Sequence, residues 1–229
     1  MKKNETWLLE GKGTINNLKL KMGRLASGVR LDQYGIFEKY IKINSSLKVL
    51  DVGASSEEDI VGTNLFDKVY PFPNRLTLAT IENAEKLRKQ YIHSNVVKIV
   101  PDCKLPFKDK EFDIVVSWAT LEHVGGYKKQ ARFINELLRV GKKIFITTPY
   151  RGCVYEPHSG IFILHWLPIN WFRKICKLLG KEFWMTEENL NPLYVHDLLQ
   201  MKLNKSISVL MYKMFRLIPS HLIITNKKI

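Results

Sequence analysis

The stretch with the most chemical content is Lys48–Gly53, an apolar run that ends in an acidic residue and a glycine. It predicts a buried strand, and the polar segment that follows it predicts a tight turn and the start of a helix. In an open α/β sheet, an adenosine-type cofactor docks at the carboxyl end of the first strand. Asp51, Gly53 and Ala54 are therefore the first candidate cofactor-binding residues.

The same turn argues against a dinucleotide cofactor. A dinucleotide site needs glycines, so that the backbone can approach a pyrophosphate at a helix N-terminus. Here Glu57, Glu58 and Asp59 follow the strand, and their charges would repel a pyrophosphate. The interval from Asp51 to the next acidic candidate, Glu82, also exceeds the roughly 20 residues of the nicotinamide fingerprint.

Histidines form the second group of reactive residues. His123 follows the fourth expected strand, and His158 follows the fifth. Both are therefore expected in loops at the carboxyl edge of the sheet, where ligands bind in open α/β folds. An imidazole can take a proton near neutral pH, which makes these two the candidate catalytic bases. We considered a metal site built from Glu156, His158 and His165, but the spacing matches no strong metal signature, and we predict no metal.

The elements that must position these residues alternate between strand and helix. Strands are expected at Leu47–Val52, Leu76–Ile81, Val96–Val100, Phe112–Trp118 and Lys143–Thr148, and helices at Ala84–Tyr91 and Tyr127–Val140. Such alternation implies right-handed crossovers and a mainly parallel sheet, which is an α/β fold.

The two ends of the chain differ from this middle part. We expect residues 1–46 to form an N-terminal helical cap, with helical spacing at Asp32–Ile43, and residues 47–229 to form one further domain with a substrate-side insertion at about 150–170. Towards the C-terminus we expect helices at Pro168–Leu179 and Ile207–Arg216, and a final strand at His221–Asn226, at or near the sheet edge. The methionines of the second helix are interpreted as core, with a peripheral membrane contact as the alternative.

Composition limits the partners. The net charge is +14, which suits an anionic partner such as nucleic acid, a phosphorylated substrate or an anionic membrane surface. There is no run of five like charges and no basic–aromatic RNA-binding signature. We therefore expect a small or lipid-linked anionic substrate as the partner, with nucleic acid as the second possibility. The three cysteines form no CxxC pair, and no apolar stretch is long enough to span a bilayer. We expect a cytoplasmic protein, peripheral at the inner membrane face in the membrane alternative, and leave its oligomeric state open.

Five short motifs, in order, resemble those of the class I S-adenosylmethionine-dependent methyltransferases, of the type 11 group related to the ubiquinone-biosynthesis enzymes. They are Val49–Gly53, Asp102–Phe107, Phe112–Val115, Leu121–Val124 and Glu136–Val140. The resemblance implies a Rossmann-like, doubly wound, mainly parallel seven-stranded sheet with helices on both faces and an antiparallel last strand. It also implies S-adenosyl-L-methionine as the cofactor, which carries no phosphate and tolerates nearby acidic residues.

The resemblance assigns roles to individual residues. Asp51 and Gly53 belong to the loop around the amino-acid and ribose parts of the cofactor. Glu82 would bind the ribose hydroxyls, since a carboxylate can accept two hydrogen bonds from a vicinal diol. Asp102, beside Cys103, would accept the adenine amino group, and we predict that its carboxylate is not part of a structural ion pair. Ser117 and Trp118 would flank the cofactor, with core packing as the alternative for Trp118.

The acceptor side follows from a second resemblance. The pattern consists of Thr148-Pro149, Glu156-Pro157-His158 and His165–Pro168. It is similar to patterns found in methyltransferases of bacterial surface-polysaccharide gene clusters. It implies a small-molecule, glycan or glycolipid acceptor, O-methylation, and substrate contacts from Tyr150, Glu156 and His165. The family's later loop glycines are replaced by Ser55 and Glu57, so two alternatives stay open: a quinone, lipid or RNA methyltransferase, and a catalytically degenerate binding protein.

Overall fold

The computed structural model describes residues 14–57, 63–156, 161–162, 166–181, 183, 186–187 and 189–228. Of residues 14–24, 155–156 and 161–162 it describes the backbone alone.

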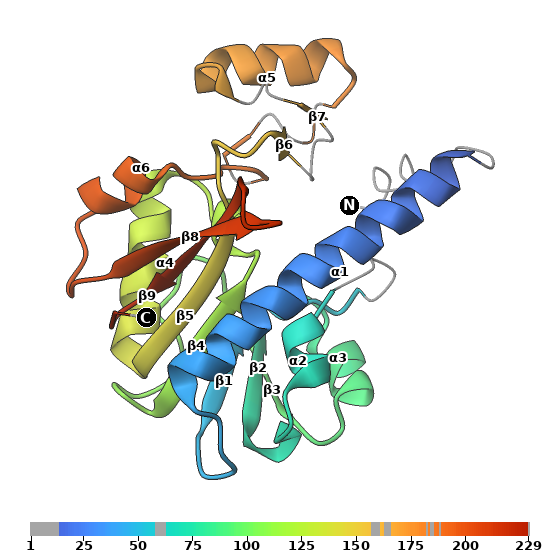
Figure 1. The fold of residues 1–229 in the computed structure, drawn as a ribbon. Coiled ribbons are helices and arrows are strands. Elements are labelled where there is room, and N and C mark those ends of the chain that lie inside the picture. Colours follow the sequence, from blue (N-terminus) through green and yellow to red (C-terminus); the bar gives the residue numbers. More distant parts are fainter. Residues whose placement is uncertain are drawn as a thin grey trace.

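A seven-stranded sheet forms the centre of the molecule, with the strand order β3-β2-β1-β4-β5-β9-β8 (Figure 1). The strands are β1 (Val49–Val52), β2 (Leu76–Thr80), β3 (Asn95–Lys98), β4 (Phe112–Trp118), β5 (Gly141–Pro149), β8 (Ser208–Met214) and β9 (Ile218–Thr225). The first five pair in parallel, whereas β9 runs antiparallel to β5 and β8 antiparallel to β9. The predicted mainly parallel, seven-stranded α/β fold is confirmed. Two further strands, β6 (Tyr155–Glu156) and β7 (Ile161–Phe162), pair only with each other.

Helices cover both faces of the sheet, except for α5 (Ile169–Leu178), which lies beyond one end of it (Figure 1). The other helices are α1 (Thr14–Ile41), α2 (Leu65–Val69), α3 (Ala84–Gln90), α4 (Tyr127–Val140) and α6 (Val195–Gln200), with 3₁₀ turns η2 (Pro73–Arg75) and η3 (Leu121–His123). Buried residues of α1, α2 and α3 share one core with the sheet, and those of α4 and α6 share the other. The apolar spacing that predicts α4 is the one that buries Ile134, Leu137 and Leu138.

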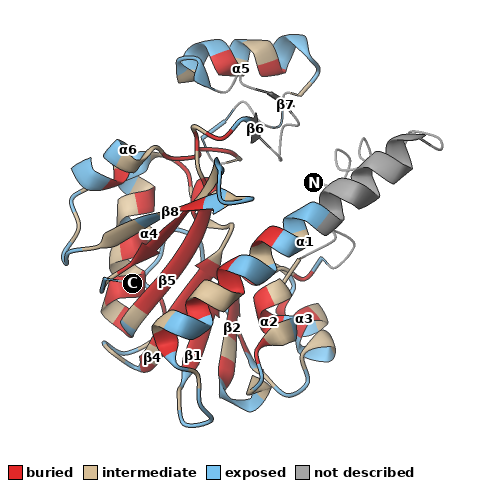
Figure 2. Ribbon diagram, viewed as in Figure 1, coloured by how far each residue is buried: buried red, intermediate tan, exposed pale blue. Residues whose placement is uncertain are grey.

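The two cores explain how the sheet is held. On the α1 face, the ring of Phe37 lies 5.1 Å from that of Phe66 and 5.3 Å from that of Phe145, both edge-on. The central strands β1, β2, β4 and β5 are buried almost throughout (Figure 2), as expected where a sheet is covered on both faces, whereas the edge strands β3 and β8 are more exposed. The helix expected at Asp32–Ile43 is the last part of the longer α1, which begins at Thr14.

The helix expected at Ile207–Arg216 is wrong, because this segment forms strand β8. Ile207, Val209 and Met211 pack against the α4-side core, whereas Tyr212 and Met214 pack against the α1-side core. That alternation is the period of a strand, and apolar residues on both faces also satisfy helical spacing over so short a run. β8 is the edge strand, and β9 lies one strand in from it. In the part of the chain that is described, no helix is both long and apolar enough to cross a membrane.

Candidate functional site

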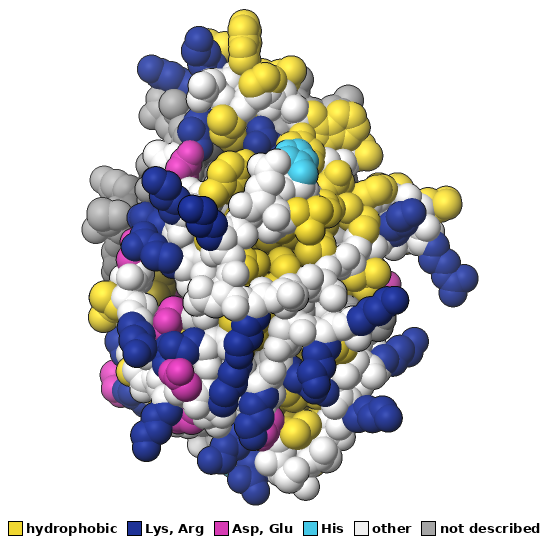
Figure 3. All heavy atoms as spheres, turned by 90° about the vertical axis from the view of Figure 1, so that its left-hand side faces the viewer, with side chains coloured by type: hydrophobic (Ala, Val, Ile, Leu, Met, Phe, Trp, Pro, Cys, Tyr) yellow, Lys and Arg dark blue, Asp and Glu magenta, His cyan; other side chains and the backbone are white. Residues whose placement is uncertain are grey.

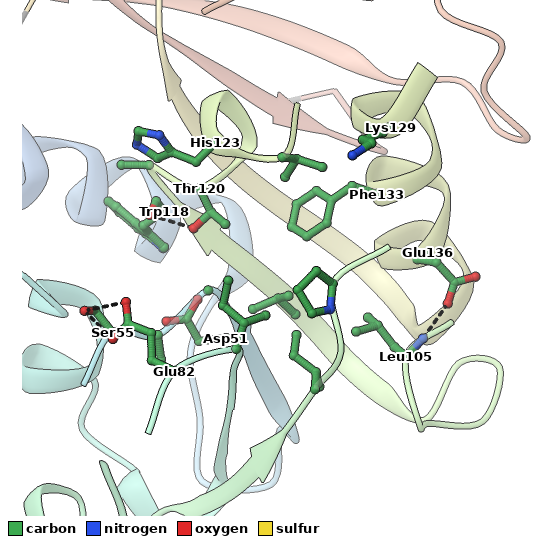
Figure 4. A pocket seen from close by; sticks show the side chains of 18 of the residues that line it. Asp51, Ser55, Glu82, Leu105, Trp118, Thr120, His123, Lys129, Phe133 and Glu136 are labelled. Carbon is green, nitrogen blue, oxygen red and sulfur yellow. Dashed lines mark hydrogen bonds between the residues drawn. The ribbon is translucent and has the colours of Figure 1, made fainter. Parts of the chain in front are cut away.

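A cavity of about 1070 Å³ lies at the carboxyl ends of β1, β2, β3 and β4 (Figure 4). Its lining includes Asp51, Gly53, Ala54, Glu82, Asp102, Cys103, Trp118 and His123. Eight of the predicted site residues thus come together although they lie far apart in the sequence. The volume lies at the upper end of the roughly 300–1,000 Å³ typical of small-molecule sites.

Gly53 makes the close approach at the base of the cavity possible. Its φ of 108° is one that side chains rarely allow, and a Cβ here would collide with the side chain of Thr120. Its N–H donates to the carbonyl of Ala79 at 2.9 Å. The turn after β1 therefore sits directly against the loop after β4, and only glycine fits between them.

The carboxylate of Glu82 is held by the loop after β1. Its Oε2 accepts from the Ser56 N–H at 2.6 Å, the Ser56 hydroxyl at 2.9 Å and the Ser55 hydroxyl at 3.0 Å, and its Oε1 lies 3.2 Å from the Ser55 hydroxyl. The loop is fixed in turn by Asn64, whose side chain bonds both the N–H and the carbonyl of Ser55. Each carboxylate oxygen has two lone-pair positions, so Oε1 keeps capacity for a ligand hydroxyl.

Asp51 lies at the end of β1 in a buried acidic pair with Asp67 of α2. Burial raises the pKa of both carboxyls above the ordinary value of 3.8, and the charge of Asp51 raises that of Asp67 further. Beside each other and buried, the two carboxyls differ in degree: the pKa of Asp51 is raised to about 7, and that of Asp67 is raised well above 3.8. A cationic ligand next to Asp51, which lines the cavity, would favour the charged form of its carboxylate.

The loop after β3 differs from expectation. Asp102 lines the cavity, but its carboxylate forms an ion pair with Lys129 of α4 at 3.0 Å, so the prediction of a carboxylate outside any ion pair is wrong. The reason is the fold: α4 begins beside this loop and places Lys129 over it. Cys103 next to it is an exposed free thiol at the rim.

Ser117 and Trp118, at the end of β4, have different positions. The Ser117 hydroxyl is buried and donates to the Val52 carbonyl at 2.8 Å, which ties β4 to β1; Ser117 is absent from the described lining of the cavity. Trp118 packs in the core, with its ring centre 5.7 Å from that of Phe66, and it also lines the cavity, so contact with a cofactor stays a prediction. Side chains alternate along a strand, which sends neighbours to opposite sides.

His123 stands in η3 at the wall of the cavity, and its Nδ1 lies 2.6 Å from the carbonyl of Asn189. A carbonyl only accepts, so Nδ1 is the protonated nitrogen and, in the neutral ring, Nε2 carries the lone pair. Nε2 lies 3.8 Å from the buried carboxylate of Glu122, which accepts from the Thr148 hydroxyl at 2.9 Å. The ring is thus fixed in the tautomer that a proton acceptor needs.

The other acceptor-side residues are not brought to the cavity within the described chain. Tyr150 packs on the α4-side core and edge-on against Tyr194, away from the described cavity lining. Glu156 is described only as backbone in β6, and His158 and His165 lie outside the described residues.

Several residues of the site were missed by sequence reasoning. Among them, Arg30 of α1, Thr120 and Asn189 line the cavity, and Asn189 also orients His123. Burial lowers the pKa of Arg30 and attraction to Glu122 raises it, so α1 also brings a guanidinium to the site. Thr120 directly precedes the motif at Leu121–Val124, which could have pointed to it, whereas no motif lies near Arg30 or Asn189 and only their long-range contacts reveal them.

Comparison with known proteins agrees with this geometry. Residues 68–144, about a third of the chain, match the model of a family described as "Methyltransferase domain". No curated protein matches the sequence. This match supports the chemistry predicted from the motifs: a methyltransferase that depends on S-adenosylmethionine.

Solved structures show the same fold at low identity. A SAM-dependent methyltransferase from Methanosarcina mazei has a TM-score of 0.50 at 14% identity, over 83% of this chain and 95% of that one. Magnesium protoporphyrin IX methyltransferase from Synechocystis, solved with bound SAH, reaches 0.54 at 11% identity, over 95% and 90%. A structure from Rhodobacter sphaeroides named for zinc-dependent alcohol dehydrogenases reaches 0.55 at 10% identity, over 86% and 90%. At these identities the likeness concerns the fold alone.

Proposed function

We propose that the protein transfers a methyl group to an oxygen of a small-molecule, glycan or glycolipid acceptor, with His123 as the general base. The observation that carries the proposal is the 2.6 Å contact between His123 Nδ1 and the Asn189 carbonyl, which leaves Nε2 as the proton acceptor. The nearby Glu122 carboxylate favours the imidazolium that forms when Nε2 takes the proton.

The cofactor fits the residues present. When bound, S-adenosylmethionine supplies an electrophilic methyl group next to a positive sulfur. Gly53 permits close approach of the backbone, Glu82 offers Oε1 to hydroxyl groups, and Asp51 places a carboxyl in the cavity whose charged form a cationic ligand would favour. Asp102 and Cys103 line the part of the cavity proposed for the adenine ring.

The choice of acceptor rests on the sequence pattern of the 150–170 segment, in which Glu156, His158 and His165 are proposed to face the acceptor; Tyr150, which packs on the α4-side core, is left out of this set. His158 is the second proposed base. The cavity volume is consistent with a cofactor and part of an acceptor bound together.

The test uses S-adenosylmethionine with an isotopically labelled methyl group, offered with sugar nucleotides, lipid-linked saccharides, a quinone and RNA. We expect the label on an oxygen of a saccharide-type acceptor, read by mass spectrometry. Label on the quinone or RNA alone would replace the proposed acceptor. Cofactor binding with no transfer to any acceptor would favour the degenerate binding protein.

Substitution of His123 tests the base. His123→Ala should lower turnover roughly 10²–10⁴-fold and leave SAH affinity nearly unchanged, and the pH dependence of turnover should flatten. His93, exposed before β3 at the opposite end of the sheet, gives the matched control His93→Ala. Near-native turnover of His123→Ala would remove it as the base and leave His158, to be tested in the same way.

A further inference from the structure

Two segments expose large apolar side chains to solvent. In and after α5, Trp171 is 63% exposed, Leu178 85% and Leu179 54%. In the turn between β8 and β9, Phe215 is 68% exposed and Leu217 80%. Single exposed apolar residues need no explanation, but groups of them on neighbouring positions mark a surface that contacts something other than water.

Both segments lie at the end of the molecule that holds the cavity. Pro149, the last residue of β5, pairs with His221, and Met214 pairs with Ile218, so the β8–β9 turn projects beyond the carboxyl end of β5. Figure 1 shows α5 beyond the same end of the sheet. We call these two segments, residues 171–179 and 213–217, the apical surface.

The apical surface is cationic as well as apolar. The sequence has no acidic residue from 157 to 181 or from 198 to 229, while these stretches hold four and six basic residues, respectively: Arg173, Lys174, Lys177 and Lys181, then Lys202, Lys205, Lys213, Arg216, Lys227 and Lys228. Lys174, Lys177, Lys213 and Arg216 are exposed beside the apolar side chains. Figure 3 shows hydrophobic side chains at the top of the molecule with Lys and Arg among them.

The combination identifies the partner by its chemistry. Exposed tryptophan and leucine can enter the boundary between headgroups and acyl chains, and lysines around them are attracted to anionic headgroups. The Nζ of Lys174 lies 5.6 Å from the centre of the Trp171 ring, so charge and apolar area are presented together. Nucleic acid would use the cations but not the exposed leucines.

We infer that the apical surface docks the protein on an anionic lipid bilayer, with α5 and the β8–β9 turn as the two contact points. The inference does not rest on the proposed methyl transfer. The helix that contacts the membrane is α5. The helix that the sequence predicted at Ile207–Arg216 cannot do so, because that segment forms strand β8. Of that segment, only the turn at its end takes part.

The test is flotation of the full chain with vesicles of phosphatidylcholine, with and without phosphatidylglycerol. We expect binding to the anionic vesicles, weakened by salt, and little binding to the neutral ones. Lys174→Gln/Lys177→Gln should lower the partition coefficient roughly 25-fold, about fivefold for each cation. Leu178→Ser/Leu217→Ser should lower it at least tenfold without a change in salt dependence.

A matched control removes the same chemistry from the opposite end. Ile92 is 73% exposed and lies near exposed Lys89, before β3, so Lys89→Gln/Ile92→Ser should bind vesicles as the parent does. All these positions are exposed, and unchanged melting temperatures will show that the variants are folded. Equal loss in the control pair, or no vesicle binding by the parent, would overturn the inference. So would self-association of the parent that Leu178→Ser/Leu217→Ser abolishes while vesicle binding stays absent, since the surface would then join two copies of the chain.

Discussion

At the scale of single residues, Glu82 has two separable roles, one in the structure of the loop after β1 and one in the proposed binding of the cofactor. Its Oε2 organises the loop of Ser55 and Ser56, and its Oε1 faces the proposed ribose position. Replacement of Glu82 therefore affects both the loop and the ligand, and a loop-only variant is needed beside it.

We predict that Glu82→Ala weakens SAH binding by about 1–3 kcal/mol, because charged hydrogen bonds to the ligand are lost. Ser56→Ala removes one hydroxyl bond to Oε2 and leaves the carboxylate in place, so its effect should stay below about 1 kcal/mol. Titration calorimetry measures both. Equal losses in the two variants would mean that Glu82 acts through the loop and does not contact the cofactor.

The buried pair of Asp51 and Asp67 gives a prediction about pH. Their pKa values are raised in the folded protein, so their contribution to stability is fully present below the ordinary pKa of 3.8 and is lost as pH rises through the raised values. Asp67→Asn keeps a donor toward Asp51 and removes the second acid. We expect it to raise the unfolding free energy at neutral pH by roughly 1 kcal/mol or more, the equivalent of about one pKa unit.

Denaturation in urea at several pH values checks this. The gain from Asp67→Asn should shrink as the pH falls toward 4. A gain of the same size at every pH would show that burial of charge is not its cause.

At the scale of elements, the position of α1 on the sheet is fixed by one aromatic contact and one hydrogen bond. Phe37 is fully buried between Phe66 and Phe145, and the hydroxyl of Tyr212 in β8 donates to Asp32 of α1 at 2.8 Å. The helix that carries Arg30 to the cavity is thus fastened to both α2 and the sheet.

We predict that Phe37→Ala lowers the unfolding free energy by about 3–5 kcal/mol, because it leaves a cavity in the α1-side core. Leu31→Ala, at a position of the same helix that is 49% exposed, should cost less than about 1 kcal/mol. Urea midpoints compare the two. Similar small losses would mean that the core closes without Phe37.

At the scale of the whole molecule, the fold alone does not choose the cofactor, since structures with the names of different enzymes share it. The residues of the site favour S-adenosylmethionine, through the carboxyl of Asp51 and the carboxylate of Glu82 in the cavity. A ligand that binds only the folded state stabilises the whole domain in proportion to its excess over Kd.

We predict that SAH at about a hundredfold excess over its Kd raises the melting temperature by roughly 5–10 °C, from about 2.7 kcal/mol of linkage in a chain of this size. NAD at the same concentration should leave it unchanged, because its pyrophosphate would meet acidic residues at the turn after β1. A shift with NAD and none with SAH would reverse the assignment of the cofactor.

Local sequence patterns by themselves determined much of this protein. The apolar run before Asp51, the period of α4 and the glycine at position 53 each depend on a few consecutive residues, and the parallel sheet follows from the order of the elements. These features are set by short-range sterics and by which face must be buried. The cofactor class is implied by the resemblance of the five motifs to those of a known family.

Tertiary structure alone decided the rest. Asp102 pairs with Lys129, His123 takes its tautomer from Asn189, and residues 208–214 become a strand because β9 supplies their hydrogen-bond partners. Each of these outcomes depends on groups that are far apart in the chain and meet only when the sheet and its covering helices have packed. A local pattern predicts which side chains are buried, but the packing of distant segments determines the hydrogen-bond or ion-pair partner of each polar group.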